Sequence, residues 1–315
     1  MSKIRRLLQG ASLVLATLFI WRFWTEILIA LSQIQHLGWG FVVLPLLFFF
    51  WNAIASIGWW RLLLQQQPVG DVHFWKLVRL RVQGQAINLV FPSGIGGDVY
   101  RTLASSYTEK SKGAAALLAD KYADSLAEIL FIFLGMLAGL LLQAHPSLPW
   151  TSLAAVAAVA TIALRWCALP LTSLLGRFPR MKRSAQLLRT CFVNPDIRKN
   201  ISLALLLHLL ERLLMLTEIW WAAQALHQPI SWGTALFASA CASCLGLILA
   251  FMPGRIGSLE GGFPLAFSAL SLSPTHGLAL ALARRTRQIL VTAVGILLLL
   301  WDSHHLRRKG DDTQA

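Results

Sequence analysis

Charged side chains inside long apolar segments are the residues of this chain best placed to do chemistry. Three carboxylates of one such segment follow one another at intervals of four residues: Asp120, Asp124 and Glu128. On a helix they share one face, and so do Arg284 and Arg287, whereas Arg285 is expected to point elsewhere. An ionisable group inside a membrane span costs about 2.5–3.5 kcal/mol on insertion scales, so such groups face one another or a polar cavity. An arginine-rich cavity suits a phosphate or carboxylate group.

Other charges in these segments support the same two interpretations. Lys121 is close enough in sequence to neutralise a neighbouring carboxylate, and Glu211 and Arg212 lie about a dozen residues into their segment, near mid-depth at about 1.5 Å per residue. One interpretation is a set of internal salt bridges that locks the helices together. The other is a polar cavity, in which Asp120, Asp124, Glu128, Glu211 and Arg212 balance charge or carry protons.

Two stretches between apolar segments cannot be continuous helices. The first, NLVFPSGIGGDVYR, runs from Asn88 to Arg101, and the second, FMPGRIGSLEGG, runs from Phe251 to Gly262. Proline removes a backbone donor and glycine favours an open turn. Irregular backbone at membrane depth persists only where protein or a water-filled cavity covers it, and a pair of such breaks in corresponding halves indicates a transport site.

The composition excludes a soluble domain. The chain has 315 residues, 56% of them hydrophobic, and a formal net charge of +14. The basic residues gather in particular loops and in a few helices, as the positive-inside rule expects, and no nucleic-acid-binding motif accompanies them. We therefore expect no nucleic acid partner. The four cysteines are expected to be small buried hydrophobic residues, including the C-x-x-C of Cys241 and Cys244.

The predicted fold class is an all-α polytopic membrane protein with about seven transmembrane spans plus two oppositely oriented re-entrant hairpins. Spans are expected at about 10–32, 39–60, 113–142, 150–171, 200–226 and 276–301, with hairpins at 72–109 and 232–272. The whole chain, 1–315, is one integral membrane domain. It comprises repeat 1 (about 10–142), repeat 2 (about 150–301) and a basic cytoplasmic loop at 176–199.

Loop charges fix the expected orientation. Both termini, the 61–81 region and the basic loop belong in the cytoplasm, and the uncharged loops near residues 35, 146, 229 and 274 belong outside. The first broken motif must then enter from the cytoplasm and return there, and the second must enter from outside and return outside. Two inverted repeats around an in-plane pseudo-two-fold axis would give this topology.

Each hairpin adds groups that favour an anion. The helices that start near Asp98 and Gly261 direct their free N–H groups to mid-depth. Asp98 and Glu260 either cap these helices, pair with nearby arginines or take up protons. Arg101 and Arg255 are the preferred head-group contacts from the hairpins.

No enzyme or metal motif is evident in the sequence. The pair His208 and Glu211 is not a zinc-protease motif, and His36, His145, His227 and His276 fall in expected outer loops. We expect no cofactor, no metal and no catalytic residue.

The motifs resemble the lysylphosphatidylglycerol synthase transmembrane region family, also called the flippase-like domain or UPF0104 group. The resemblance rests on PSGIGGDVYR, ADKYAD, MPGRIGSLEGG and an arginine in the last span, and it covers nearly the whole chain. Glu260 corresponds to the acidic residue of the family's second motif. Arg255 stands where the family usually has glycine, and Lys121 stands where arginine is common. The soluble lysyl-transferring domain of the bifunctional relatives is absent, so the resemblance implies lipid translocation without synthesis.

The resulting expectation is a transporter that flips an anionic or polyprenyl-phosphate-linked lipid across the bacterial inner membrane. The alternatives are a membrane-embedded transferase acting on a lipid-linked sugar or phospholipid head group, and a scaffold for a separate lipid-synthesis enzyme. The expected substrate-binding residues are Arg101, Arg255, Arg284, Arg287, Asp98, Glu260, Asn88 and Lys121.

Overall fold

The computed structural model is helical wherever it assigns regular structure to the chain. It describes residues 40–65, 73–90, 95–104, 110–142, 195–249 and 257–311, together with Gln186, Arg189, Val193 and Arg255. In this part of the chain there are eight helices and no strand. They are α3 (Gly40–Leu64), α4 (Phe74–Val90), α5 (Ile95–Ala104), α6 (Lys110–Leu141), α9 (Pro195–Ala225), α10 (Trp232–Ile248), α11 (Ser258–Ala269) and α12 (Pro274–Asp311).

Four of the described helices are long and apolar enough to cross a membrane. The crossing segments are Val42–Leu64, Lys112–Leu141, Arg198–Ala225 and Pro274–Ser303. They coincide with four of the spans predicted from sequence. The predicted spans at 10–32 and 150–171, and about two thirds of the basic loop at 176–199, lie outside the described residues.

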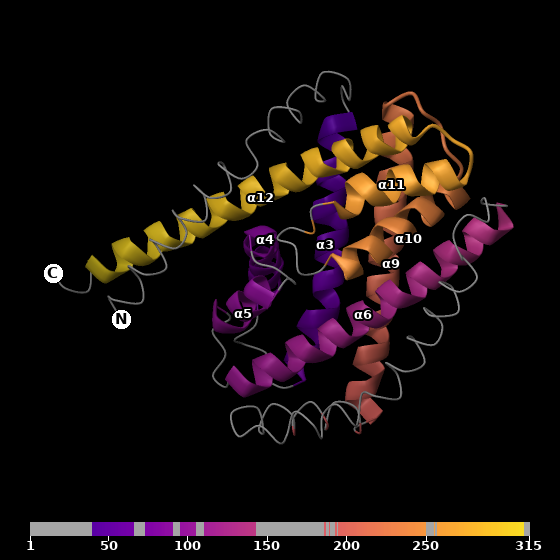
Figure 1. Ribbon diagram of the computed structural model, residues 1–315. Coiled ribbons are helices and arrows are strands. Elements are labelled where there is room, and N and C mark those ends of the chain that lie inside the picture. Colours follow the sequence, from indigo (N-terminus) through magenta and orange to yellow (C-terminus); the bar gives the residue numbers. More distant parts are fainter. Residues whose placement is uncertain are drawn as a thin grey trace.

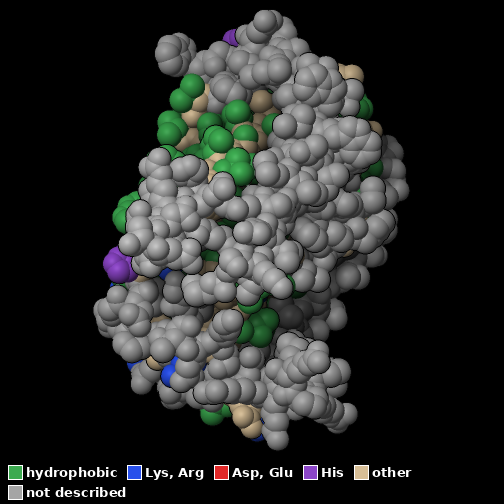
Figure 2. Space-filling model, turned by 90° about the vertical axis from the view of Figure 1, so that its left-hand side faces the viewer, with side chains coloured by type: hydrophobic (Ala, Val, Ile, Leu, Met, Phe, Trp, Pro, Cys, Tyr) green, Lys and Arg blue, Asp and Glu red, His purple; other side chains and the backbone are tan. Residues whose placement is uncertain are grey.

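The long helices present apolar stripes on their outer faces. Leu46 and Phe50 of α3 are 61% and 60% exposed, and Leu206 and Leu213 of α9 are 62% and 56% exposed. Figure 2 shows such side chains gathered in the upper part of one face, with basic side chains in the lower part. A monomeric soluble protein rarely exposes so much apolar side chain, whereas lipid covers it at no cost. The protein is therefore a membrane protein.

Each of the two sequence breaks lies between two short helices, α4 and α5 in the first case and α10 and α11 in the second. In Figure 1, α4 and α5 lie on one side of the bundle and α10 and α11 on the other, with α6 and α12 running obliquely past both. The helix α10 packs against α6, and α4 packs against α12. Each pair thus contacts a long helix from the opposite half of the chain, while α3 and α9 pack against each other.

Small residues allow these helices to approach closely. A Cβ added to Gly135 of α6 would overlap Ala240 Cβ and lie 2.8 Å from the carbonyl oxygen of Leu236, both in α10. A Cβ on Gly295 of α12 would lie 2.7 Å from Ala86 Cβ in α4. In membranes, where water does not drive helices together, such close contact supplies much of the association energy.

Helix ends are satisfied locally. Ser231 caps α10 by accepting a hydrogen bond from the Thr234 amide at 3.0 Å. Gly257 precedes α11 with a φ of 90°, and its amide donates to Glu260 Oε2 at 3.0 Å. The helix-capping role considered for Glu260 is therefore confirmed, and the helix begins at Ser258 rather than Gly261.

We expect Gly135→Ala to lower the free energy of unfolding by about 1–3 kcal/mol, because the added methyl group overpacks the contact between α6 and α10. Thermal unfolding of purified protein in detergent would measure the change. Gly261→Ala is the matched control, since its added Cβ would lie 3.3 Å from the movable end of the Leu245 side chain. Equal melting temperatures for the two variants would contradict this account of the packing.

Candidate functional site

A cavity of about 360 Å³ lies where the two pairs of short helices meet the long ones. Its wall combines side chains from α3, α4, α5, α6, α9, α10, α11 and α12 with Arg255 from the segment before α11. Six of the lining side chains carry positive charge: Lys121, Arg212, Arg255, Arg284, Arg285 and Arg287. Two carry negative charge, Asp98 and Glu128. A polar pocket with this excess of cations is suited to an anion.

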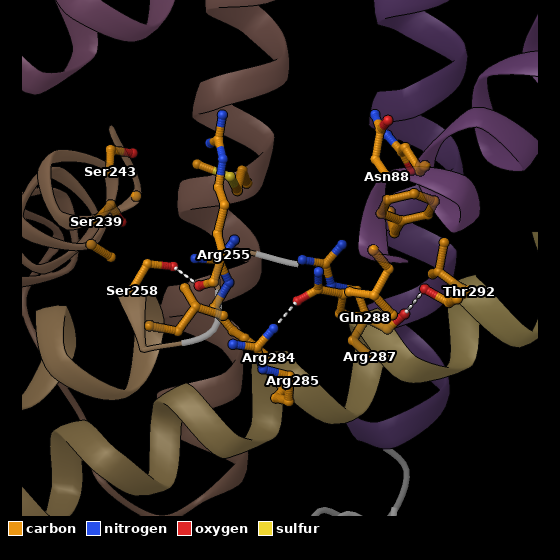
Figure 3. Close-up of a pocket in the computed structure, with 18 of the residues that line it drawn as sticks. Asn88, Ser239, Ser243, Arg255, Ser258, Arg284, Arg285, Arg287, Gln288 and Thr292 are labelled. Atoms are coloured by element: carbon orange, nitrogen blue, oxygen red, sulfur yellow. Dashed lines mark hydrogen bonds between the residues drawn. The ribbon is translucent and has the colours of Figure 1, made fainter. Parts of the chain in front are cut away.

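Three arginines within about one turn of α12 form one side of the cavity. Arg284, Arg285 and Arg287 are 6%, 3% and 8% exposed. Figure 3 shows them below the cavity, with Ser239 and Ser243 of α10 on one side and Asn88 on the other. Arg285 points away from Arg284 and Arg287, as the spacing predicts, because it pairs with Glu260. It nevertheless lines the cavity as they do. The cavity wraps around more of the helix than the single face that the spacing of three suggests.

Arg285 forms an ion pair with Glu260 of α11, the acidic residue of the second broken motif. Its Nε donates to Glu260 Oε1 at 2.8 Å, and Nη2 donates to Glu260 Oε2 at 2.9 Å. This two-pronged geometry is the strongest arrangement of an arginine and a carboxylate. Because Glu260 also caps α11, it fixes this hairpin to α12. Glu260 itself is not among the residues that line the cavity.

Arg284 and Arg287 share a single buried carboxylate, Glu218 of α9. Its Oε1 lies 2.9 Å from Arg287 Nε and 3.8 Å from Arg284 Nε. Glu218 is wholly buried, and its Oε2 accepts from Trp51 Nε1 at 3.4 Å. Neither Arg284 Nε nor Arg287 Nε has a hydrogen-bond partner of good geometry.

The first hairpin places polar groups opposite the arginines of α12. Asn88 accepts from the Gly97 amide at 2.6 Å and so closes α4 onto α5. Asp98 forms an ion pair with Arg101 and lies 3.8 Å from Lys121 Nζ. Asn88, Asp98 and Lys121 line the cavity, but Arg101 does not. The Arg101 guanidinium lies instead over the Trp59 ring, 5.8 Å from its centroid.

Arg255 enters the cavity from the segment between α10 and α11. It has a φ of 50°, a left-handed conformation that costs a non-glycine residue some energy. Its side chain is 46% exposed, and Nη1 lies 3.8 Å from Glu128 Oε1. In Figure 3 this side chain crosses the middle of the cavity. Of the arginines in the wall, it is the one most open to a ligand.

A second ionic cluster adjoins the cavity between α4, α6 and α9. His208 donates or accepts at 2.8 Å to Glu211 and at 3.1 Å to Asp120, and Arg81 lies 3.3 Å from Glu211. Arg212 donates to Asp124 at 2.7 Å and joins this cluster to the cavity. Each residue of this cluster that the sequence suggested for charge balance or proton coupling pairs with another charged residue. The salt-bridge interpretation therefore describes this part of the network.

These residues fit an ion-pair network better than a metal centre. Asp124, His208 and Glu211 each offer a ligand atom within 4.8 Å of the others. However, both ring nitrogens of His208 already contact carboxylates, and two guanidinium groups lie against the same oxygens. A cation would have to enter beside two fixed positive charges.

Sequence reasoning missed several residues that the structure brings to the site. It assigned no role to Glu218 or Arg81, and it considered His208 only as part of a metal motif that it rejected. Gln288, which accepts from Arg285 Nη1 at 2.8 Å, follows Arg287 directly, so adjacency to the arginines was an available signal. No such signal marked Ser239 and Ser243, whose segment is apolar throughout.

Fold and cavity together define an all-helical membrane protein with a basic internal pocket. The chain belongs to the lysylphosphatidylglycerol synthase TM region family, whose model matches residues 9–295. The resemblance found in the motifs is therefore confirmed, and the family places the protein in lipid metabolism or translocation. No curated protein and no solved structure matches the chain significantly.

Replacing His208 with leucine should destabilise the protein by about 1–3 kcal/mol, because it removes the hydrogen bonds that the ring makes with the buried carboxylates of Asp120 and Glu211. The melting temperature of the purified protein would report the loss. His276→Leu serves as the control, since His276 is exposed. A His208→Leu variant as stable as the parent would show that the cluster does not support the fold.

Proposed function

We propose that this protein moves an anionic lipid, or a polyprenyl-phosphate-linked lipid, between the leaflets of the bacterial inner membrane. The observation that carries the proposal is the cavity among membrane-crossing helices whose wall presents six cationic and two anionic side chains. Family membership supports a lipid as the ligand. In this proposal both termini lie in the cytoplasm, and the protein binds no nucleic acid.

The physical task of such a protein is to replace water around a charged head group. An isolated ionised group costs tens of kcal/mol in an idealised low-dielectric medium, so it crosses only where protein charges and donors substitute for hydration. Guanidinium groups match phosphate geometry with paired N–H donors. Arg255, Arg284 and Arg287 are the proposed head-group contacts, with Asn88, Asp98 and Lys121 across the cavity.

Arg101 and Glu260, which the sequence suggested as substrate contacts, have a different role in this proposal. Arg101 is held by Asp98 and Trp59 outside the cavity, and Glu260 is held by Arg285. We propose that both shape the site by fixing its walls. Asp124, Glu128 and Arg212 balance the charge of the wall nearest α6, and Asp120 and Glu211 do so from the buried cluster.

We further propose that α4–α5 and α10–α11 are re-entrant hairpins of opposite direction within an inverted repeat. The helix contacts support this arrangement, because exchanging α3, α4, α5 and α6 with α9, α10, α11 and α12 maps each pair of described helices in contact onto another pair in contact. The pair α4 and α12 then corresponds to α10 and α6, and the contact of α3 with α9 corresponds to itself.

Arg284→Ala should reduce appearance of labelled anionic lipid in the opposite leaflet of proteoliposomes at least tenfold, because it removes a buried guanidinium from the cavity. Arg61→Ala is the control, since Arg61 is exposed at the end of α3. Both variants would be checked for yield and folding. Unchanged lipid movement in Arg284→Ala would remove this residue from the site.

The same liposome assay distinguishes lipid translocation from the second candidate function. The family is named after a synthase, which favours a membrane-embedded transferase as the alternative. Movement of the label without covalent change supports translocation, whereas a new lipid product, with or without a soluble donor, supports the transferase. If purified protein neither moves nor binds the lipid, a role as scaffold for a separate synthesis enzyme replaces both.

Single cysteines at the ends of each hairpin test the proposed topology. In a background without the four natural cysteines, His73→Cys and Leu103→Cys should both react with an impermeant thiol reagent from the cytoplasmic side. His227→Cys and Ser273→Cys should both react from the outside. All four positions are exposed in the structure. A hairpin whose two ends react from opposite sides spans the membrane and overturns the assignment.

A further inference from the structure

Glu218 Oε1 is the one buried carboxylate oxygen among the described residues that has no hydrogen-bond partner. Glu218 is fully buried and lies behind two arginines of the cavity wall without itself lining the cavity. Its Oε1 has no hydrogen bond of good geometry, although Arg287 Nε lies 2.9 Å away. Arg284 Nε is 3.8 Å from the same oxygen, too far for a hydrogen bond.

The charge around Glu218 is also incomplete. One carboxylate faces two guanidinium groups, so one positive charge is left over at this wall. Aromatic rings provide the remaining surroundings. The Arg287 guanidinium lies 5.0 Å from the Phe48 centroid and 5.9 Å from that of Trp51, and Arg284 lies 5.7 Å from that of Phe263. Ring faces attract a cation but neither neutralise it nor accept its hydrogen bonds as an oxygen does.

Glu260 provides the internal comparison. Both of its oxygens accept short hydrogen bonds from Arg285, and one accepts from the Gly257 amide as well. That pair is saturated and holds a hairpin in place. Glu218 and its two arginines have the same chemistry, but their ion pair leaves three buried polar atoms unsatisfied. The two donors among them, Arg284 Nε and Arg287 Nε, favour a further oxygen ligand, since an unmet buried donor costs about 1–3 kcal/mol.

We propose that Glu218 is an internal counter-anion that competes with the phosphate of the substrate for Arg284 and Arg287. In the empty cavity Glu218 holds these two guanidinium groups. A phosphate that enters from the cavity takes them over through their open N–H donors, and Glu218 regains them when the phosphate leaves. The competition keeps the lipid from being trapped. The second half of this inference, the release step, rests on the proposed lipid translocation.

Competition of this kind has a measurable consequence. When the binding-competent form is only a fraction of the population, the apparent dissociation constant rises in proportion to the inverse of that fraction. Glu218→Gln removes the competing charge and keeps the side-chain shape. We therefore expect inorganic phosphate to bind this variant about tenfold more tightly than the parent. Lipid movement should slow severalfold, because release becomes the slow step.

The experiment titrates inorganic phosphate into purified protein in detergent and follows binding by calorimetry and by melting temperature. The matched control is Asp302→Asn, which removes a carboxylate 2.5 Å from Arg79 outside the cavity and changes the net charge equally. Phosphate should raise the melting temperature of Glu218→Gln more than that of the parent or of Asp302→Asn. A carboxylate with a purely structural role would give a less stable variant that phosphate does not rescue.

Three outcomes decide the inference. Tighter phosphate binding in Glu218→Gln, with slower lipid movement, supports it. Equal phosphate binding in all three proteins overturns it, whatever the parent does with lipid. Tighter binding in Glu218→Gln together with a parent that moves no lipid supports the counter-anion and overturns the proposed function instead. If Glu218→Gln is not recovered folded, Glu218→Asp takes its place. Its shorter side chain draws back from Arg287, and phosphate should bind it two- to threefold more tightly; binding no tighter than the parent's overturns the inference.

Discussion

Charges inside a hydrocarbon layer must find partners within the protein, and this requirement shapes the molecule. The arginines of α12 could not lie in a membrane-crossing helix alone. Their partners come from elsewhere in the chain, with Glu218 on α9 and Glu260 on α11. Because each ion pair joins two elements, neutralising the charges also fixes how the helices sit against one another. The membrane-crossing helices are thus held together by charged side chains, which would cost free energy in the membrane if they were unpaired.

Close contact between small residues accompanies ionic contact where α4 meets α12. The hairpins reach the long helices at Gly135 against Ala240 and at Gly295 against Ala86, where a larger side chain would hold the backbones apart. At the interface of α4 and α12, Arg79 pairs with Asp302 at 2.5 Å and donates to the Leu298 carbonyl at 3.3 Å, close in sequence to Gly295. Packing and electrostatics therefore depend on the same interface, and a change in one would alter the other.

The cavity lies where neutralisation is incomplete. In the cluster around His208 nearly every charge has several partners, although Arg81 Nη1 and Arg212 Nε make no hydrogen bond. Beside it, Arg255 is half-exposed and Arg284 has no short partner, so the wall retains positive charge and free donors. A buried network whose charges are balanced at one end and in positive excess at the other can be held in the membrane and still receive an anion.

The sequence alone determined the class of protein, four membrane-crossing segments, the two helix breaks and the family. These follow from local properties: runs of apolar residues, proline and glycine, and short motifs such as PSGIGGDVYR. It also placed Asp120, Asp124 and Glu128 on one face, because helical periodicity needs no knowledge of the partner helix.

Only the tertiary structure decided which charges pair and which remain open. It joined Glu218 to Arg284 and Arg287, and Glu260 to Arg285, and it excluded Arg101 from the cavity wall. These outcomes depend on the contacts of α12 with α9 and α11, which bring together residues far apart in the sequence. Spacing along one helix fixes the direction of a side chain, whereas its partner is fixed by the neighbouring helix that the packing supplies.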